Sequence, residues 1–211
     1  MSFEKSVFIN CPFDDEYSPI LQAILFCVVY LGFEPRSALE SQDSAETRIV
    51  KILGLIEASR YSIHDLSRSR AKKKGEFYRL NIPFELGLDY GCRHFVKNGQ
   101  SNKKILILQS IKYQHQIALS DLSGCDLEVH GSDYKTAIRK VRNWLATEAG
   151  IAAVGAGLIE GKYLEFQEWI DKKLIGQGFS DADIQDYPTK ELLESMKIWV
   201  STVERPQNKL I

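Results

Sequence analysis

Short apolar runs alternate with longer segments of helical periodicity over the first 150 residues. The runs that predict strands cover residues 6–10, 33–38, 61–65, 104–108 and 126–130. Apolar residues three and four positions apart predict helices over 20–31, 49–56, from about 81 onward, and over 134–145. Alternating strands and helices favour a parallel sheet covered on both faces. We therefore expect a flavodoxin-like, doubly wound α/β fold with strand order 2-1-3-4-5.

A small, glycine-rich stretch, Gly150–Gly157, separates this region from the C-terminal part. It suggests an α/β domain over residues 1–150, for which a nucleotide-binding site is argued below, and a helical appendage over residues 157–205. Two apolar stripes at helical spacing mark the appendage, and they contain Trp169 with Ile170 and Met196 with Trp199. Such stripes usually pack in a core or against a second subunit, so a homo-oligomer is expected.

Composition narrows the possible classes of protein. The chain holds 27 Lys plus Arg against 28 Asp plus Glu, a balance that carries no strong signal for nucleic-acid binding. Its four cysteines are far apart and form no CxxC pair, which favours reduced thiols over a disulfide framework or a metal site. The most apolar run, Ile20–Leu31, is too short to span a bilayer, and the first residues lack the basic start of an export signal. We therefore expect a cytoplasmic protein that does not bind membranes.

Polar residues follow the strands that flank the expected reversal of strand order. Ligands of doubly wound sheets bind beyond the carboxyl ends of the strands at this point. Strand one ends in Asn10 and is followed by Pro12, Phe13 and Asp14. Strand three ends in Asp65 and is followed by Arg68, and the next helix opens with Asn81 and contains Glu85. We expect these residues to form one site for a nucleotide or nucleoside.

Glu85 is the candidate catalytic residue. In the first turn of a helix, the partial positive charge of the helix N-terminus would keep its pKa low and its carboxylate ionised. An ionised carboxylate can stabilise the oxocarbenium-like ribose that forms when an N-glycosidic bond breaks. Asp65 could accept hydrogen bonds from a ribose, and Asn10, Phe13 and Asp14 could hold a base or ribose. Arg68 begins a basic loop that could steer a polyphosphate towards the site.

No GxGxxG motif follows strand one, and the chain has no phosphate-binding P-loop and no metal-ligand spacing. A dehydrogenase or a P-loop nucleoside triphosphatase is therefore disfavoured. We expect no cofactor, and NAD enters only as a possible substrate.

Three segments together resemble a known superfamily. V-F-I-N-C-P-F-D at 7–14, R-Y-S-I-H-D-L-S-R at 60–68 and N-I-P-F-E-L-G-L at 81–88 resemble a group of uncharacterised bacterial proteins and, more distantly, the nucleoside 2-deoxyribosyltransferase and TIR-domain superfamily. The resemblance spans about residues 5–110. It implies that Glu85 is the catalytic glutamate and Asp65 the aspartate after strand three. Arg79–Pro83 departs from the transferase pattern, which has a small-residue turn and a further Asp there.

Three functions remain open from the sequence. The first is an N-glycosidase that cleaves NAD or a related nucleotide, for which the TIR-like resemblance implies a role in bacterial anti-phage defence. The second is a non-catalytic sensor of a nucleotide signal. The third is a phosphoacceptor receiver domain, with Asp14, Asp15 and Asp65 as its acidic cluster and Ser110 after strand four. The receiver reading lacks a lysine directly after strand five.

Overall fold

The computed structural model describes residues 2–40, 43, 45–68, 71, 74–75, 80–96 and 102–203. Its five strands are β1 (Ser6–Asn10), β2 (Glu34–Arg36), β3 (Tyr61–Asp65), β4 (Lys104–Gln109) and β5 (Glu128–Val129). All neighbouring strands are parallel, and their order is β2-β1-β3-β4-β5. The predicted doubly wound fold is confirmed.

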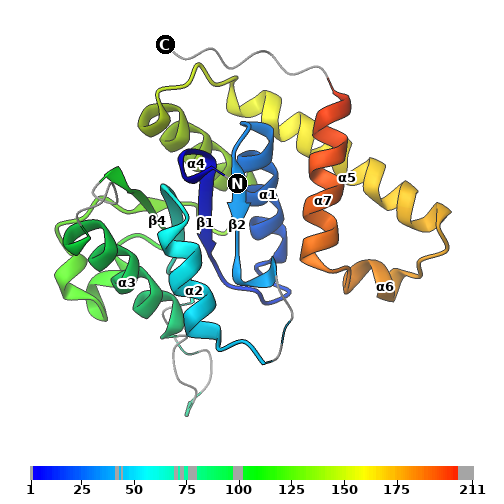
Figure 1. The fold of residues 1–211 in the computed structure, drawn as a ribbon. Coiled ribbons are helices and arrows are strands. Elements are labelled where there is room, and N and C mark those ends of the chain that lie inside the picture. The colour runs from blue at the N-terminus through cyan, green and yellow to red at the C-terminus, as the bar shows by residue number, and fades with distance from the viewer. Residues whose placement is uncertain are drawn as a thin grey trace.

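Four helices cover the two faces of the sheet: α1 (Ser18–Tyr30), α2 (Arg48–Glu57), α3 (Asn81–Phe95) and α4 (Tyr134–Ala149). Side chains alternate between the faces along each strand. In β1, Val7 and Ile9 join the large core formed with α1 and α4, whereas Phe8 packs against Ile52 and Ile56 of α2. The helices α2 and α3 therefore share one face of the sheet, opposite α1 (Figure 1).

The C-terminal segment is helical, as expected, and consists of α5 (Ala156–Gly176), α6 (Asp181–Gln185) and α7 (Thr189–Thr202). It packs on the outer side of α1, whose residues from Ala23 to Tyr30 are all buried (Figure 1). The Phe26 ring of α1 contacts the rings of Tyr163, Phe166 and Trp199. One hydrophobic core thus joins the sheet region to the C-terminal helices.

The two C-terminal stripes are buried within this chain. Ile170 is 5% exposed, Met196 is fully buried and Trp199 is 6% exposed, while Trp169 packs against the same core and is half-buried. Burial of the stripes therefore needs no second subunit, and the homo-oligomer stays a prediction.

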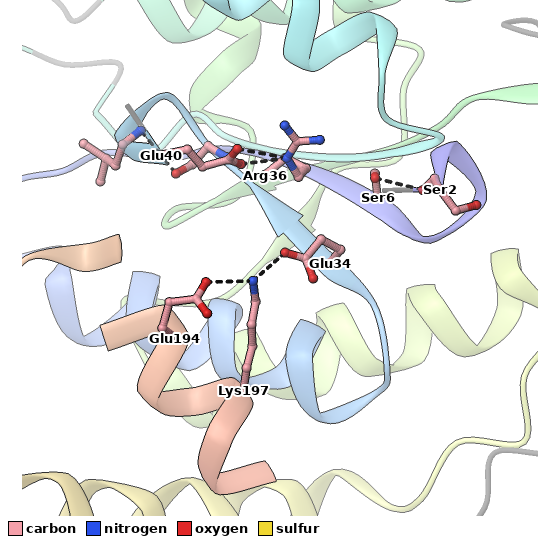
Figure 2. A network of polar contacts seen from close by, with 9 residues as sticks. Ser2, Ser6, Glu34, Arg36, Glu40, Glu194 and Lys197 are labelled. Atoms are coloured by element: carbon pink, nitrogen blue, oxygen red, sulfur yellow. Dashed lines mark hydrogen bonds and ion pairs between the residues drawn. The ribbon is translucent and has the colours of Figure 1, made fainter. Parts of the chain in front are cut away.

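Ion pairs attach α7 to the edge strand β2. Figure 2 shows Lys197 of α7 between two carboxylates, with its Nζ 2.6 Å from Glu34 Oε1 and 3.1 Å from Glu194 Oε1. At the end of β2, Arg36 Nε donates to Glu40 Oε1 at 2.8 Å. Pro35 lies in the middle of β2, and this strand is shorter than the predicted 33–38.

Two expectations fall partly outside the described residues: the basic loop after Arg68, and the last residues of the appendage predicted to end at 205. No helix within the described ranges is both long and apolar enough to cross a bilayer.

Candidate functional site

A cavity of about 420 Å³ lies at the carboxyl end of β1, beside the first residues of α2 and α3. Its volume falls in the range of small-molecule sites, and its position is the predicted reversal of strand order. It is lined by Asn10, Cys11, Pro12, Phe13, Arg48, Leu80, Asn81, Ile82 and Glu85. Five predicted site residues meet here: Asn10, Pro12, Phe13, Asn81 and Glu85.

Glu85 differs from its expected setting in two ways. It is the fifth residue of α3, beyond the first turn, and only 4% of its surface is exposed. Burial raises the pKa of its carboxyl above the ordinary value, and the nearby Arg48 guanidinium offsets this only in part. The expected low pKa is therefore wrong, because desolvation outweighs the helix N-terminus at this depth. The result is a carboxyl group held at the wall of a cavity in a poorly solvated position.

Arg48 begins α2 and forms an ion pair with Glu85. Its Nη2 lies 3.7 Å from Glu85 Oε1, an ion-pair distance that exceeds that of a good hydrogen bond. The arginine side chain is 53% exposed, and the glutamate side chain is 6% exposed. The sequence analysis missed Arg48, because 37 positions separate it from Glu85 and only the packing of α2 beside α3 brings them together.

Asn10 is fixed at the base of the cavity by two contacts. Its Nδ2 donates to the carbonyl oxygen of Ile82 at 3.2 Å and contacts Nδ1 of His64 at 2.9 Å. An amide donor at Nδ1 leaves Nε2 as the nitrogen that carries the ring proton, and Nε2 donates to Asp89 Oδ2 at 3.0 Å. The amide of Asn10 is therefore held in one orientation by β3 and α3.

A buried lysine continues this chain of polar contacts. Lys103 Nζ lies 3.2 Å from Asp89 Oδ1 and donates to the carbonyl oxygens of Ile56 and Ser59, near the end of α2. Burial alone would raise the pKa of Asp89, but His64 and Lys103 bring it below the ordinary value. Asp89 follows Glu85 by four residues on α3. In the sequence, this spacing of four residues already indicates that the two carboxylates lie on the same helix face.

Asp65 lies away from the cavity, in a separate buried network. Its Oδ2 accepts hydrogen bonds from the Tyr17 hydroxyl at 2.5 Å and from His130 Nε2 at 2.9 Å, and Oδ1 accepts the Ser67 amide at 2.8 Å. Burial alone would raise the pKa of Asp65, but these hydrogen bonds bring it below the ordinary value. Asp65 and His64 are adjacent in β3 and therefore point to opposite faces of the sheet. As a result, His64 and not Asp65 points towards α3.

Asp14 and Arg68 pair with each other outside the residues that line the cavity. Arg68 Nε donates to Asp14 Oδ2 at 3.0 Å, and its Nη2 also contacts Glu16 Oε2 at 2.9 Å. The pair links the loop after β1 to the loop after β3. In this arrangement the charge of Arg68 is directed at two carboxylates of this chain.

The chain matches no known family model, no curated protein and no solved structure. Its geometry is therefore the basis on which a function can be argued. Within the part of the chain that the structure describes, no three His, Cys, Asp or Glu residues are grouped in a way that could hold a metal ion. The receiver reading is disfavoured by Asp65, which is fully buried and accepts three hydrogen bonds, so its carboxylate is not open to a phosphoryl donor.

Proposed function

We propose that this protein is an N-glycosidase that cleaves the ribose–base bond of NAD or a related nucleotide in the cavity beside Glu85. The observation that carries the proposal is the setting of Glu85, a carboxyl group 4% exposed at the wall of a cavity large enough for a ligand. Asn10 and Phe13 line the same cavity and supply an oriented amide and an aromatic ring. Together they offer groups for a ribose hydroxyl, a base and a developing cation.

The proposed reaction needs one carboxylate. The bond between C1′ and the base nitrogen breaks, and nicotinamide leaves as a neutral molecule with the bonding electron pair. The ribose becomes cationic, and water then adds its oxygen to C1′ and releases a proton. Because nicotinamide needs no protonation to leave, no general acid is required. A preorganised negative charge in a poorly solvated cavity stabilises the cationic ribose more strongly than water does.

The resemblance to deoxyribosyltransferases and TIR-like enzymes supports the same role for Glu85. The resemblance lies in the segments 7–14, 60–68 and 81–88, and residues of the first and third of these line the cavity. The resemblance also supports a role in anti-phage defence, which loss of phage protection in cells that carry a Glu85→Gln variant would test. The resemblance assigns Asp65 to the site. In this proposal Asp65 instead has a structural role, because it lies in a separate buried network.

The test is base release by the purified chain incubated with NAD, followed by chromatography. Glu85→Gln keeps the size of the side chain and removes the charge. We expect base release to fall by two orders of magnitude or more, which is about 3 kcal/mol of transition-state stabilisation.

The matched control is Glu57→Gln, because Glu57 ends α2 but does not line this cavity. This control should release base like the parent. Equal turnover by folded Glu85→Gln and parent proteins would contradict the catalytic role.

A non-catalytic nucleotide sensor is the second candidate. The ion pair between Arg48 and Glu85 favours it, because a ligand that separates the two charges would change contacts between α2 and α3 without any reaction. Calorimetric binding of NAD with no base release over hours would support the sensor over the enzyme.

A further inference from the structure

The cavity contains a cation as well as a carboxylate. Among the described residues that line it, Arg48 is the one cationic residue. About half of its side chain is exposed, and it lies 3.7 Å from Glu85 without a short hydrogen bond between the two. The guanidinium is therefore still able to form a bidentate contact with an anion.

The backbone near Arg48 also contributes positive charge to the cavity. Arg48 is the first residue of α2, and Asn81 is the first residue of α3. Each of these helices has at least ten residues, and neither N-cap side chain, Thr47 or Leu80, accepts a hydrogen bond from its first turn. These two helix N-termini, whose N-cap side chains make no capping hydrogen bond, add partial positive charge to that of Arg48.

This positive charge opposes the proposed reaction when the substrate carries no anionic group. A guanidinium next to Glu85 weakens the ability of the carboxylate to stabilise a cationic ribose. An anionic group on the substrate would draw the guanidinium to itself and leave Glu85 free to face the ribose. Because Arg48 and Glu85 are neighbours, that anion has to be attached close to the reacting carbon.

We propose that Arg48 binds the phosphate on the 5′ carbon of the reacting ribose, so that the site selects phosphorylated nucleotides over the corresponding nucleosides. The proposal rests on the proposed function for its reacting group, while the binding of the anion can be measured without any reaction. Arg48 is thus assigned as a residue that determines substrate specificity, and it has no direct part in bond cleavage.

The test compares nicotinamide mononucleotide with nicotinamide riboside, which share the leaving group and differ only in the 5′-phosphate. For the parent we expect kcat/KM for the mononucleotide to exceed that for the riboside by at least tenfold. Arg48→Gln should remove at least tenfold from the mononucleotide, mainly through a higher KM, and should leave the riboside unchanged or faster. Lys51→Gln is the matched control, because it removes a positive charge from the same helix at a residue that does not line the cavity.

Calorimetric binding of ribose 5-phosphate, with ribose as the control, separates the failure of this proposal from that of the enzyme function. If the parent binds ribose 5-phosphate, Arg48→Gln does not, and no substrate releases its base, the enzyme function is overturned and the anion site is supported. If base is released with equal kcat/KM for mononucleotide and riboside, the enzyme function is supported and the anion site is overturned. The same follows if Arg48→Gln lowers kcat/KM equally for both substrates.

Discussion

Glu85 shows how burial changes the behaviour of a single carboxyl group. Burial raises its pKa in the folded protein, so folding favours its protonated form. The stability that this group contributes is fully present below the pKa of an unfolded glutamate and is lost as the pH rises through the folded pKa. Above the folded pKa the ionised Glu85 therefore costs stability, as expected of a residue placed for function rather than for folding.

We expect Glu85→Gln to be at least as stable as the parent at pH 7. Its advantage in the free energy of unfolding should shrink as the pH falls towards 4, where Glu85 becomes protonated. Loss of the loose pair with the half-exposed Arg48 should cost at most about 1 kcal/mol. Urea unfolding between pH 4 and 8 measures both effects.

Glu168→Gln serves as the control for this experiment, because it removes a negative charge from a side chain that is 76% exposed. A Glu85→Gln variant whose stability falls relative to the parent as the pH rises from 4 to 7 would contradict the assigned pKa direction.

At the scale of elements, Lys103 holds two helices against the sheet. It lies just before β4, donates to carbonyl oxygens near the end of α2, and pairs with Asp89 in the middle of α3. Both charged side chains are fully buried. A buried pair of this kind adds little net stability over an apolar pair, but removal of one partner leaves the other charge uncompensated.

We expect Lys103→Met to lower the free energy of unfolding by about 3–5 kcal/mol. Adding Asp89→Asn should recover part of this loss, because the unpaired buried charge is then gone. The neighbouring Lys104→Met is the control: the Lys104 side chain is 42% exposed and pairs with Glu148 on the surface, so its loss should cost less than about 1 kcal/mol. Equal losses in the free energy of unfolding for the two lysine variants would argue against a structural role for the buried pair of Lys103 and Asp89.

The sequence predicts elements better than it predicts contacts between them. The apolar period of two or of three to four residues indicates where strands and helices lie, and topology rules then determine strand order. Asn10 and Glu85 could be placed together because both follow from this topology. The face on which His64 or Asp65 lies could not be predicted, because β3 is buried on both sides and its pattern is continuous. Arg48 depends on how α2 packs on α3, which no local pattern encodes.

At the scale of the whole molecule, the C-terminal helices complete the core around α1. Phe26 would be exposed without them, since it contacts rings from both α5 and α7. All three tryptophans lie in the helical layers, as Trp144, Trp169 and Trp199. Trp169 and Trp199 report on the C-terminal helices, whereas Trp144 of α4 packs against Tyr61 of β3 and also reports on the sheet.

We expect the sheet and the C-terminal helices to unfold in one transition. Along a urea series, the change in tryptophan fluorescence should coincide with the loss of hydrogen-exchange protection at the β1 and β3 amides. Trp199→Ala should lower both midpoints together, at a cost of about 3–5 kcal/mol. Two separated transitions would instead show that residues 1–150 and 157–205 fold as independent units.

The two edges of the sheet restrict how this protein can meet other chains. On one side, β2 has three residues, and the charged residues on either side of its central proline form ion pairs (Figure 2). On the other side, β5 has only two residues, and Glu128 pairs with Lys140. Short, charged and proline-containing edges give a poor template for strand addition. The sheet should therefore resist edge-to-edge aggregation in concentrated solution, and a protein partner is expected to dock on helices or loops.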